Sequence, residues 1–261
     1  MKQETPWLAC VAGLVSVAEL LFHPVHSTLE SFISGQIILI DKPLWWTSFD
    51  VVRKCRNIIT NNLKIKKLKV GHAGTLDPLA TGLMVICTGK ATKRISEWMD
   101  ADKEYIAVIE LGRTTPSFDL ETETDAIFPT GHITRESFGA SLQTFLGETQ
   151  QSPPLFSAKN LQGKRAYTFA REGSDIELPP QPVTISELEL IRFNLPVVEL
   201  RLRCSKGTYI RAFARDLGRA NQSGACLVGL RRTAIGGFSV EKALSPELFE
   251  QIINHKNITQ S

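Results

Sequence analysis

Apolar and polar residues alternate along this chain in patterns that predict short strands and helices in an irregular order. Short apolar runs, or apolar residues at every second position, predict strands over residues 36–41, 83–87, 105–111, 183–193 and 197–204. Apolar residues at helical spacing predict helices over residues 48–60, 90–99, 135–145, 166–171 and 209–218. Strands and helices do not alternate one for one, so we expect an α+β fold around a central mixed or antiparallel sheet flanked by helices.

Two segments between these elements are predicted to lack regular structure. Residues 117–125 are acidic and polar, and indicate a loop in which Asp119, Glu121 and Glu123 face water. Residues 152–158 contain Pro153 and Pro154, which favour an extended chain over a helix.

Composition narrows the class of protein without revealing a function. The 261 residues are 43% hydrophobic and 22% charged, as in an ordinary globular protein of one large domain or two small ones. The formal net charge of +3 is too small to indicate nucleic-acid binding by itself. Basic residues are nevertheless crowded between positions 53 and 69: Arg53, Lys54, Arg56, Lys64, Lys66, Lys67 and Lys69. They indicate either a solvated basic face or a positive surface for a polyanionic substrate, and the residues alone favour neither.

The cysteines and the N-terminal segment bear on location. Five cysteines, far apart and without a CxxC pair, indicate reduced thiols in the cytoplasm rather than disulfides or a zinc site, and no metal is expected. Residues 7–22 form an apolar run interrupted by Glu19, which is short for a membrane span and has a weak signal-peptide character. We expect no membrane partner, and interpret residues 1–34 as an extension of unknown role.

The most informative stretch is neutral, glycine-rich and contains a single carboxylate. Residues 70–82 include Gly71, Gly74 and Gly82, which permit tight turns or a close approach of the backbone, and Pro78, which fixes the chain after Asp77. An aspartate in such a loop is either a turn former or a reactive group. The residues alone favour the turn former slightly.

The sequence GHAGTLDPLATGLM, residues 71–84, resembles the catalytic-aspartate segment of the TruB family of tRNA pseudouridine synthases. Further motifs of that family follow in the same order along the chain, at residues 39–43, 47–52, 103–105, 152–158, 163–167, 204–211 and 230–233. The resemblance spans residues 35–240, which it identifies as a pseudouridine synthase catalytic domain. Residues 241–261 are then a short C-terminal tail without a full RNA-binding PUA domain.

The resemblance implies an isomerase that flips uridine-55 out of the T arm of tRNA and converts it to pseudouridine. It implies no cofactor and no obligate protein partner, with tRNA as the partner. Asp77 resembles the catalytic aspartate, which acts either as a nucleophile at C1′ or by removing a sugar proton. Arg211 matches the arginine that pairs with it and keeps it ionised.

The same resemblance assigns the remaining site residues. Tyr105 corresponds to the tyrosine that stacks on the target uracil and lies near C5, where a proton must leave. Tyr209 and Leu230 are expected to line the same pocket, and His72 to contact the space that the extruded base vacates. The Lys42-Pro43 dipeptide is expected to support the Asp77 loop.

Two positions depart from the family pattern, and other functions stay open. Trp45 stands where the family commonly has glycine, and Lys159 comes one position early, with Asn160 at the usual lysine position. One alternative is an RNA-binding or tRNA-folding protein of the same fold, against which Asp77, Tyr105, Tyr209 and Arg211 argue. Another is the same chemistry on another RNA. A glycosidase would need a second, suitably placed acid, which the Asp77 loop does not contain.

Overall fold

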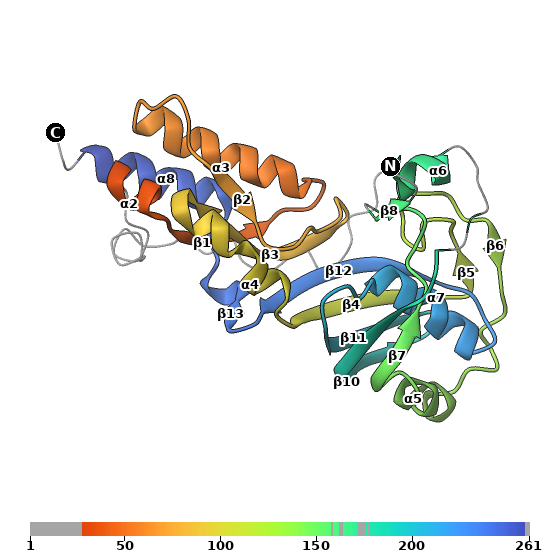
Figure 1. Cartoon of the computed structure of the whole chain (residues 1–261). Helices are drawn as coiled ribbons and strands as arrows, with labels where there is room; N and C mark the ends of the chain where they lie inside the picture. Colours follow the sequence, from red (N-terminus) through yellow and green to blue (C-terminus); the bar gives the residue numbers. More distant parts are fainter. Residues whose placement is uncertain (1–27, 158, 162–163, 172–175, 177, 259–261) are drawn as a thin grey trace.

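The computed structural model describes residues 28–157, 159–161, 164–171, 176 and 178–258. Its centre is a mixed sheet of nine strands (Figure 1). Along the sheet the strands lie in the order β1 (Ile37–Lys42), β3 (Ala80–Thr88), β12 (Ala225–Ile235), β4 (Lys103–Leu111), β11 (Val197–Cys204), β10 (Gln181–Asn194) and β7 (Gly147–Gln151). Strand β2 (Val70–His72) pairs with β3, and β13 (Phe238–Ser239) with β12. The β3–β12 pair is parallel, and the other pairs are antiparallel.

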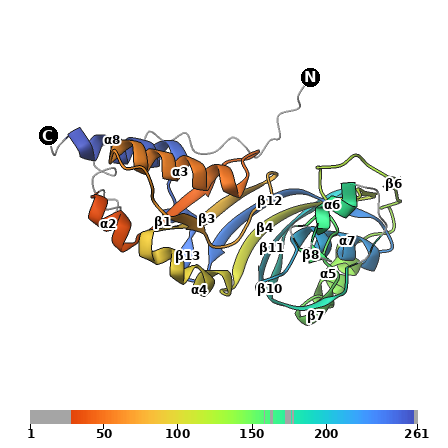
Figure 2. The ribbon, with the colours of Figure 1, turned by 45° about the horizontal axis from the view of Figure 1, so that its top comes forward.

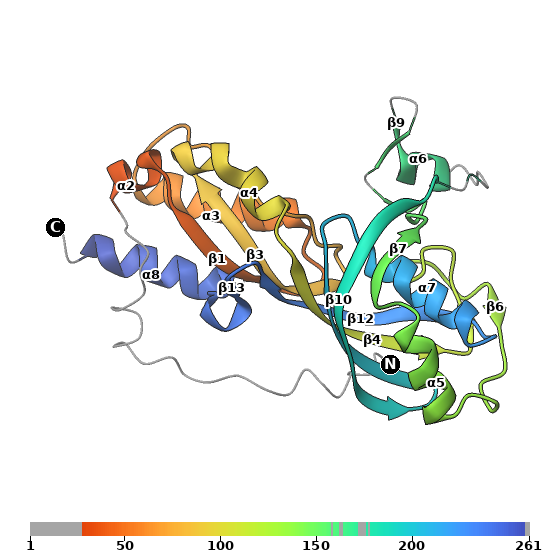
Figure 3. The same cartoon turned by 60° about the horizontal axis from the view of Figure 1, so that its bottom comes forward.

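Helices gather at the two ends of this sheet. At the β1–β3 end lie α2 (Leu29–Ser34), α3 (Ser48–Asn62), α4 (Ile95–Met99) and α8 (Pro246–Ile258), with α3 and α8 side by side (Figure 2). At the β10–β7 end lie α5 (Arg135–Gln143) and α7 (Ile210–Ala220), with α6 (Ala166–Arg171) beyond them (Figure 3). Two 3₁₀ helices, η1 (Gly89–Arg94) and η2 (Val240–Lys242), complete the helical elements of the described chain. Two separate two-stranded sheets are also present. One pairs β5 (Arg113–Thr114) with β6 (Ala126–Ile127), and the other pairs β8 (Asn160–Leu161) with β9 (Lys164–Arg165).

Local sequence explains why the best-predicted elements form. Helix α3 begins with a capping box, in which the Thr47 hydroxyl accepts the Asp50 N–H and the Asp50 carboxylate accepts the Thr47 N–H. One face of α3 is buried, through Val51, Val52, Cys55, Ile58 and Ile59. Strand β4 alternates buried and half-buried residues along its whole length, the pattern of a strand with one face in the core.

The structure confirms the predicted α+β class and its mixed sheet, and each predicted strand and helix has a counterpart. The predicted helix over residues 90–99 is divided, with η1 followed by the short α4. Strands β7 and β12 and helices α2 and α8 are among the elements that were not predicted. Four cysteines, Cys55, Cys87, Cys204 and Cys226, are buried free thiols.

The prediction that Asp119 faces water is wrong. Its side chain is 5% exposed, and one carboxylate oxygen accepts the Ser117 hydroxyl at 2.6 Å and the Glu121 N–H at 2.9 Å. The acidic segment therefore folds back on Asp119 in a local turn that directs this carboxylate inward, because an aspartate accepts backbone N–H groups two residues further on.

The ends of the described chain pack on the body of the protein. Phe32 of α2 is fully buried, and its carbonyl accepts the Thr88 hydroxyl at 3.0 Å. Helix α8 buries Phe249, Ile252 and Ile253, and its Glu250 lies 2.5 Å from Lys54 of α3. The predicted boundaries at residues 34 and 240 therefore separate segments that share this core. The apolar run over residues 7–22 lies outside the described residues. Within those residues, no helix is long and apolar enough to cross a membrane.

Candidate active site

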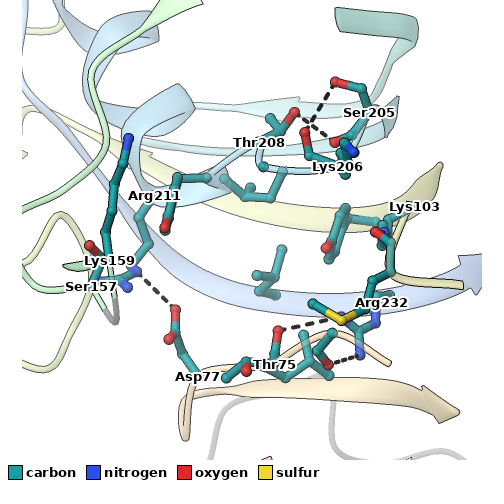
Figure 4. Close-up of a pocket in the computed structure, with 18 of the residues that line it drawn as sticks. Thr75, Asp77, Lys103, Ser157, Lys159, Ser205, Lys206, Thr208, Arg211 and Arg232 are labelled. Atoms are coloured by element: carbon teal, nitrogen blue, oxygen red, sulfur yellow. Dashed lines mark hydrogen bonds and ion pairs between the residues drawn. The ribbon is translucent and has the colours of Figure 1, made fainter. Parts of the chain in front are cut away.

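A cavity of about 710 Å³ opens between the two halves of the sheet (Figure 4). The Asp77 loop forms one side and the turn from β11 into α7 forms the other, while β4 and β12 form the floor. Five of the predicted site residues line it: Asp77, Tyr105, Tyr209, Arg211 and Leu230. The structure thus brings together residues that are up to 153 positions apart in the chain.

The Asp77 loop is tied to both β1 and α3. The Ser48 hydroxyl, at the start of α3, accepts the Leu76 N–H at 2.8 Å and donates to the Leu76 carbonyl at 3.1 Å. Lys42, fully buried at the end of β1, donates to three carbonyl oxygens, those of Pro43 at 3.0 Å, Trp46 at 2.6 Å and Pro78 at 3.4 Å. Burial lowers the pKa of Lys42 to about 8. Lys42 and Pro43 do not line the cavity, and Lys42 links the Pro43 carbonyl to the Pro78 carbonyl, next to Asp77.

Arg232 ties the other side of the loop to the sheet. This guanidinium is 1% exposed and donates to three carbonyls, those of Leu83 at 2.8 Å, Gly74 at 3.1 Å and Thr75 at 3.5 Å. Gly82 lies opposite Arg232 in the β3–β12 pair and has a φ of +105°. A Cβ at Gly82 would lie 2.3 Å from the Arg232 carbonyl oxygen, so this close approach of two strands requires glycine.

Asp77 and Arg211 form an ion pair at the edge of the cavity. Asp77 Oδ2 lies 2.9 Å from Arg211 Nε, the contact drawn in Figure 4. The Asp77 side chain is 40% exposed, whereas that of Arg211 is 6% exposed. Arg211 also donates to the carbonyls of Ser117 at 3.2 Å and Phe156 at 2.9 Å. Its plane is therefore fixed by three groups, and Asp77 presents its carboxylate toward the open space.

Asp119 is a second carboxylate beside Arg211 whose position was not predicted from the sequence. Its Oδ2 lies 3.6 Å from Arg211 Nε, so one buried arginine nitrogen faces two carboxylates, Asp77 and Asp119. The available signal was the row of polar residues at alternate positions, Ser117, Asp119 and Glu121, because such a segment can bind one of its own carboxylates by side-chain and backbone donors. The contact of Asp119 with Arg211 of α7 joins distant parts of the chain, so local sequence does not predict it.

Aromatic and apolar side chains form the rest of the inner cavity. Tyr105 projects from β4 directly opposite Arg232 in the register, and Leu230 projects from β12. Burial raises the pKa of Tyr105, so its phenol stays neutral near pH 7. Tyr209 precedes α7, and Gln151 binds its backbone, accepting its N–H at 2.8 Å and donating to its carbonyl at 3.2 Å.

The outer part of the cavity is polar and charged. Lys159 donates to the Gln181 side chain at 2.8 Å, and Lys206 pairs with Asp100 at 2.9 Å. Lys159, the lysine that comes one position early, thus reaches the cavity from its shifted place. Among the described residues, no cluster of three or more His, Cys, Asp or Glu side chains is placed to hold a metal ion.

His72 and Trp45 lie beside the cavity rather than on its lining. His72 belongs to β2, opposite Ile86, and burial lowers its pKa, which favours the neutral imidazole. Trp45 is 72% exposed with a φ of +70°, and its N–H donates to the Pro78 carbonyl at 2.8 Å. The chain here adopts the left-handed conformation that glycine adopts most readily, so Trp45 leaves the turn beside Asp77 in place.

This arrangement suits chemistry on a flat ring joined to a polyanion. A carboxylate held by a fixed cation faces a space walled by tyrosine and leucine side chains, and lysines stand at its mouth. Such a site can hold a planar group against Tyr105 and present Asp77 to the atom beside it.

Comparisons with known sequences point to one family. The profile of the family described as TruB family pseudouridylate synthase (N terminal domain) matches residues 60–210. A protein of Parabacteroides distasonis named tRNA pseudouridine synthase B is 56% identical over 222 residues, which are 85% of this chain and 94% of that protein. Proteins of the same name from Bacteroides fragilis and Flavobacterium johnsoniae are 54% and 50% identical, over 87% and 86% of this chain and 98% of each relative.

Solved structures show the same fold in larger chains. A chain from a Cbf5–Nop10–Gar1 complex matches 85% of this chain with a TM-score of 0.62 and 26% identity. A chain from an H/ACA RNP bound to a substrate RNA containing 2′-deoxyuridine matches 84% of it with a TM-score of 0.60 and 25% identity. This chain spans only 60% and 54% of the lengths of those two.

Proposed function

This chain belongs to the TruB family of pseudouridylate synthases, and we propose that it converts uridine to pseudouridine in tRNA, at position 55 in the T arm. The observation that carries this proposal is the Asp77–Arg211 pair, 2.9 Å apart at the edge of a cavity lined by Tyr105 and Leu230. The relatives named tRNA pseudouridine synthase B, which this chain covers almost completely, support tRNA as the substrate.

The reaction is an isomerisation that needs no external reactant. The N1–C1′ bond of the bound uridine breaks, the uracil turns, and a C5–C1′ bond forms. A proton then leaves C5, and N1 carries one in the product. We assign the attack on C1′, or the removal of a sugar proton, to Asp77. Arg211 would hold the Asp77 carboxylate and fix its direction.

The remaining residues would hold the flipped nucleotide. The Tyr105 ring supports the uracil face, with Leu230 and Tyr209 completing the pocket. Burial raises the pKa of Tyr105 further above its usual value, so the phenol is protonated when the nucleotide binds, and we assign to its hydroxyl a part in moving the C5 proton. His72 contacts the RNA beside the pocket, at the space that the extruded base vacates. Lys159 and Lys206, at the mouth, contact phosphates next to the target.

The decisive experiment maps pseudouridine in tRNA from cells with and without the gene for this protein. We expect loss of the modification at position 55 alone, and its restoration by the wild-type gene but not by one encoding Asp77→Asn. The purified protein should also modify an isolated T-arm stem-loop. Unchanged modification at position 55 would refute the proposal, and a lost modification in ribosomal RNA instead would assign the same chemistry to another substrate.

A further inference from the structure

A second basic region lies far from the cavity, at the opposite end of β3. Lys67 and Lys69 precede β2, and Lys90 and Lys93 belong to η1. The Gly89 N–H donates to the Lys69 carbonyl at 2.9 Å, which joins the two segments. Together they surround a hollow of about 340 Å³ whose remaining lining residues are Ile33, Leu68, Gly89 and Thr92. We call this hollow the distal lysine groove.

Two elements of known length measure its separation from the active site. Strand β3 has nine residues and begins at Ala80, whose N–H donates to the Asp77 carbonyl, and it ends at Thr88 beside the groove. At about 3.3 Å per residue, it spans roughly 26 Å. Helix α3 has 15 residues, runs from the Asp77 loop toward the same end and spans about 22 Å. The lysines that are closest to the Asp77 loop in sequence therefore lie well outside the cavity.

The charge of the groove is not neutralised by the protein. Within the part of the chain that the structure describes, no carboxylate pairs with any of its four lysines, and all four are exposed. By contrast, the nearby Arg94 pairs with Glu97 at 2.8 Å, and Lys54 of α3 pairs with Glu250. The formal charge of the whole chain is only +3, so these four lysines alone exceed it. The groove therefore carries a local excess of positive charge.

We propose that the distal lysine groove binds the sugar–phosphate backbone of the substrate RNA, away from the nucleotide that reacts. This inference rests on the proposed function, because it takes tRNA as the polyanion. Unpaired lysines at the rim of a hollow provide point charges for phosphates. An acidic protein is a poorer fit, because protein interfaces are depleted in lysine and use aromatic and arginine anchors, which this groove lacks. At roughly 25 Å from Asp77, the groove requires an RNA longer than a short hairpin loop.

The test compares two RNAs and two charge-matched variants. The groove variant combines Lys67→Gln, Lys69→Gln, Lys90→Gln and Lys93→Gln. The control variant removes four exposed cations elsewhere, by Arg135→Gln, Arg192→Gln, Arg219→Gln and Lys242→Gln. Each protein is titrated with full-length unmodified tRNA and with an isolated T-arm stem-loop, over a salt series. Thermal unfolding verifies that both variants are folded.

We expect the groove variant to bind full-length tRNA about 10- to 100-fold more weakly at low salt, with a salt slope smaller by about one for each phosphate that the lysines no longer neutralise. Its affinity for the stem-loop and its single-turnover rate at saturating RNA should stay within about threefold of wild type. The control variant should keep most of its affinity for tRNA.

Three results would overturn the groove assignment. The first is an unchanged tRNA affinity and salt slope in the groove variant, and the second is an equal loss in the control variant. The third is tighter binding of an acidic polyglutamate peptide than of RNA at the groove, which would assign it to a protein partner. None of these touches the proposed function, which fails separately if wild-type protein does not modify the stem-loop.

Discussion

The substitution Arg211→Lys tests whether the plane of this guanidinium, rather than its charge, holds Asp77. The arginine contacts Asp77 through Nε at 2.9 Å, the Ser117 carbonyl at 3.2 Å and the Phe156 carbonyl at 2.9 Å. A lysine ammonium at the end of a flexible stem cannot meet three groups that lie around the edge of a planar fork. We expect the charge to stay buried and the direction of the carboxylate to be lost.

The contacts set the size of the effect. Retaining one of the three contacts removes two hydrogen bonds from a charged donor, each worth about 1.5–3 kcal/mol. If about 3 kcal/mol of that loss falls on the transition state, the single-turnover rate falls roughly 100-fold or more, at about 1.4 kcal/mol per tenfold. RNA affinity should change little, because Arg211 is 5% exposed and its donors are already occupied.

The assay is a single-turnover reaction on RNA labelled with tritium at C5 of uridine, since that hydrogen leaves when C5 joins C1′. The matched control is Arg215→Lys, one turn further along α7. Arg215 is also buried and donates to the Ser152 carbonyl at 3.1 Å, but it does not line the cavity. A wild-type rate in folded Arg211→Lys would refute the role of the planar contact. An equal loss in Arg215→Lys would show that α7 is merely sensitive to substitution.

Three further substitutions test this pair and its surroundings. Asp77→Asn should abolish turnover and leave RNA affinity within about tenfold of wild type, because phosphate contacts dominate affinity; measurable turnover by the purified variant contradicts this. Asp119→Asn should slow the single-turnover rate about tenfold with unchanged RNA affinity, since it removes the second charge at 3.6 Å from Arg211; an unaltered rate makes Asp119 structural only. Burial lowers the pKa of Lys42 to about 8 from 10.5. Between these two pH values the unfolded chain binds more protons at Lys42 than the folded chain does. The contribution of Lys42 to the free energy of unfolding therefore increases as the pH rises. Chemical unfolding of wild type and Lys42→Met should therefore diverge in favour of wild type from pH 8 to 10.5, by up to about 3 kcal/mol, and parallel curves would show that Lys42 titrates normally.

Local sequence predicted the parts of the site that depend on local conformation. The loop around Asp77 is readable because glycine, proline and aspartate restrict the backbone over a few residues. Helix α8 was equally readable, although we did not predict it. Ser245 and Pro246 form a helix start, and the Ser245 hydroxyl accepts the Leu248 N–H at 3.1 Å.

Tertiary contacts account for what the sequence could not predict. Asp119 is buried because Ser117, Glu121 and Arg211 bind it, and Arg211 lies 92 residues further along the chain. The lysines before β2 are close to Asp77 along the chain. In space these lysines lie far from Asp77, because the full length of α3 and of β3 separates them from the Asp77 loop.

Buried positive charges surround the cavity, and the proposed reaction gives them a role. Four lie in or beside it: Lys42, Lys103, Arg211 and Arg232. In the described part of the chain only two carboxylates, Asp77 and Asp119, form an ion pair with any of these four, and both face Arg211. Lys42 and Arg232 are instead satisfied by backbone carbonyls, which bind a cation without cancelling its charge. In the proposed reaction, breaking the N1–C1′ bond leaves electron density on the uracil. Fixed positive groups stabilise such a charge without reorganising, so we expect the cations that hold the Asp77 loop in place to favour the cleaved state as well.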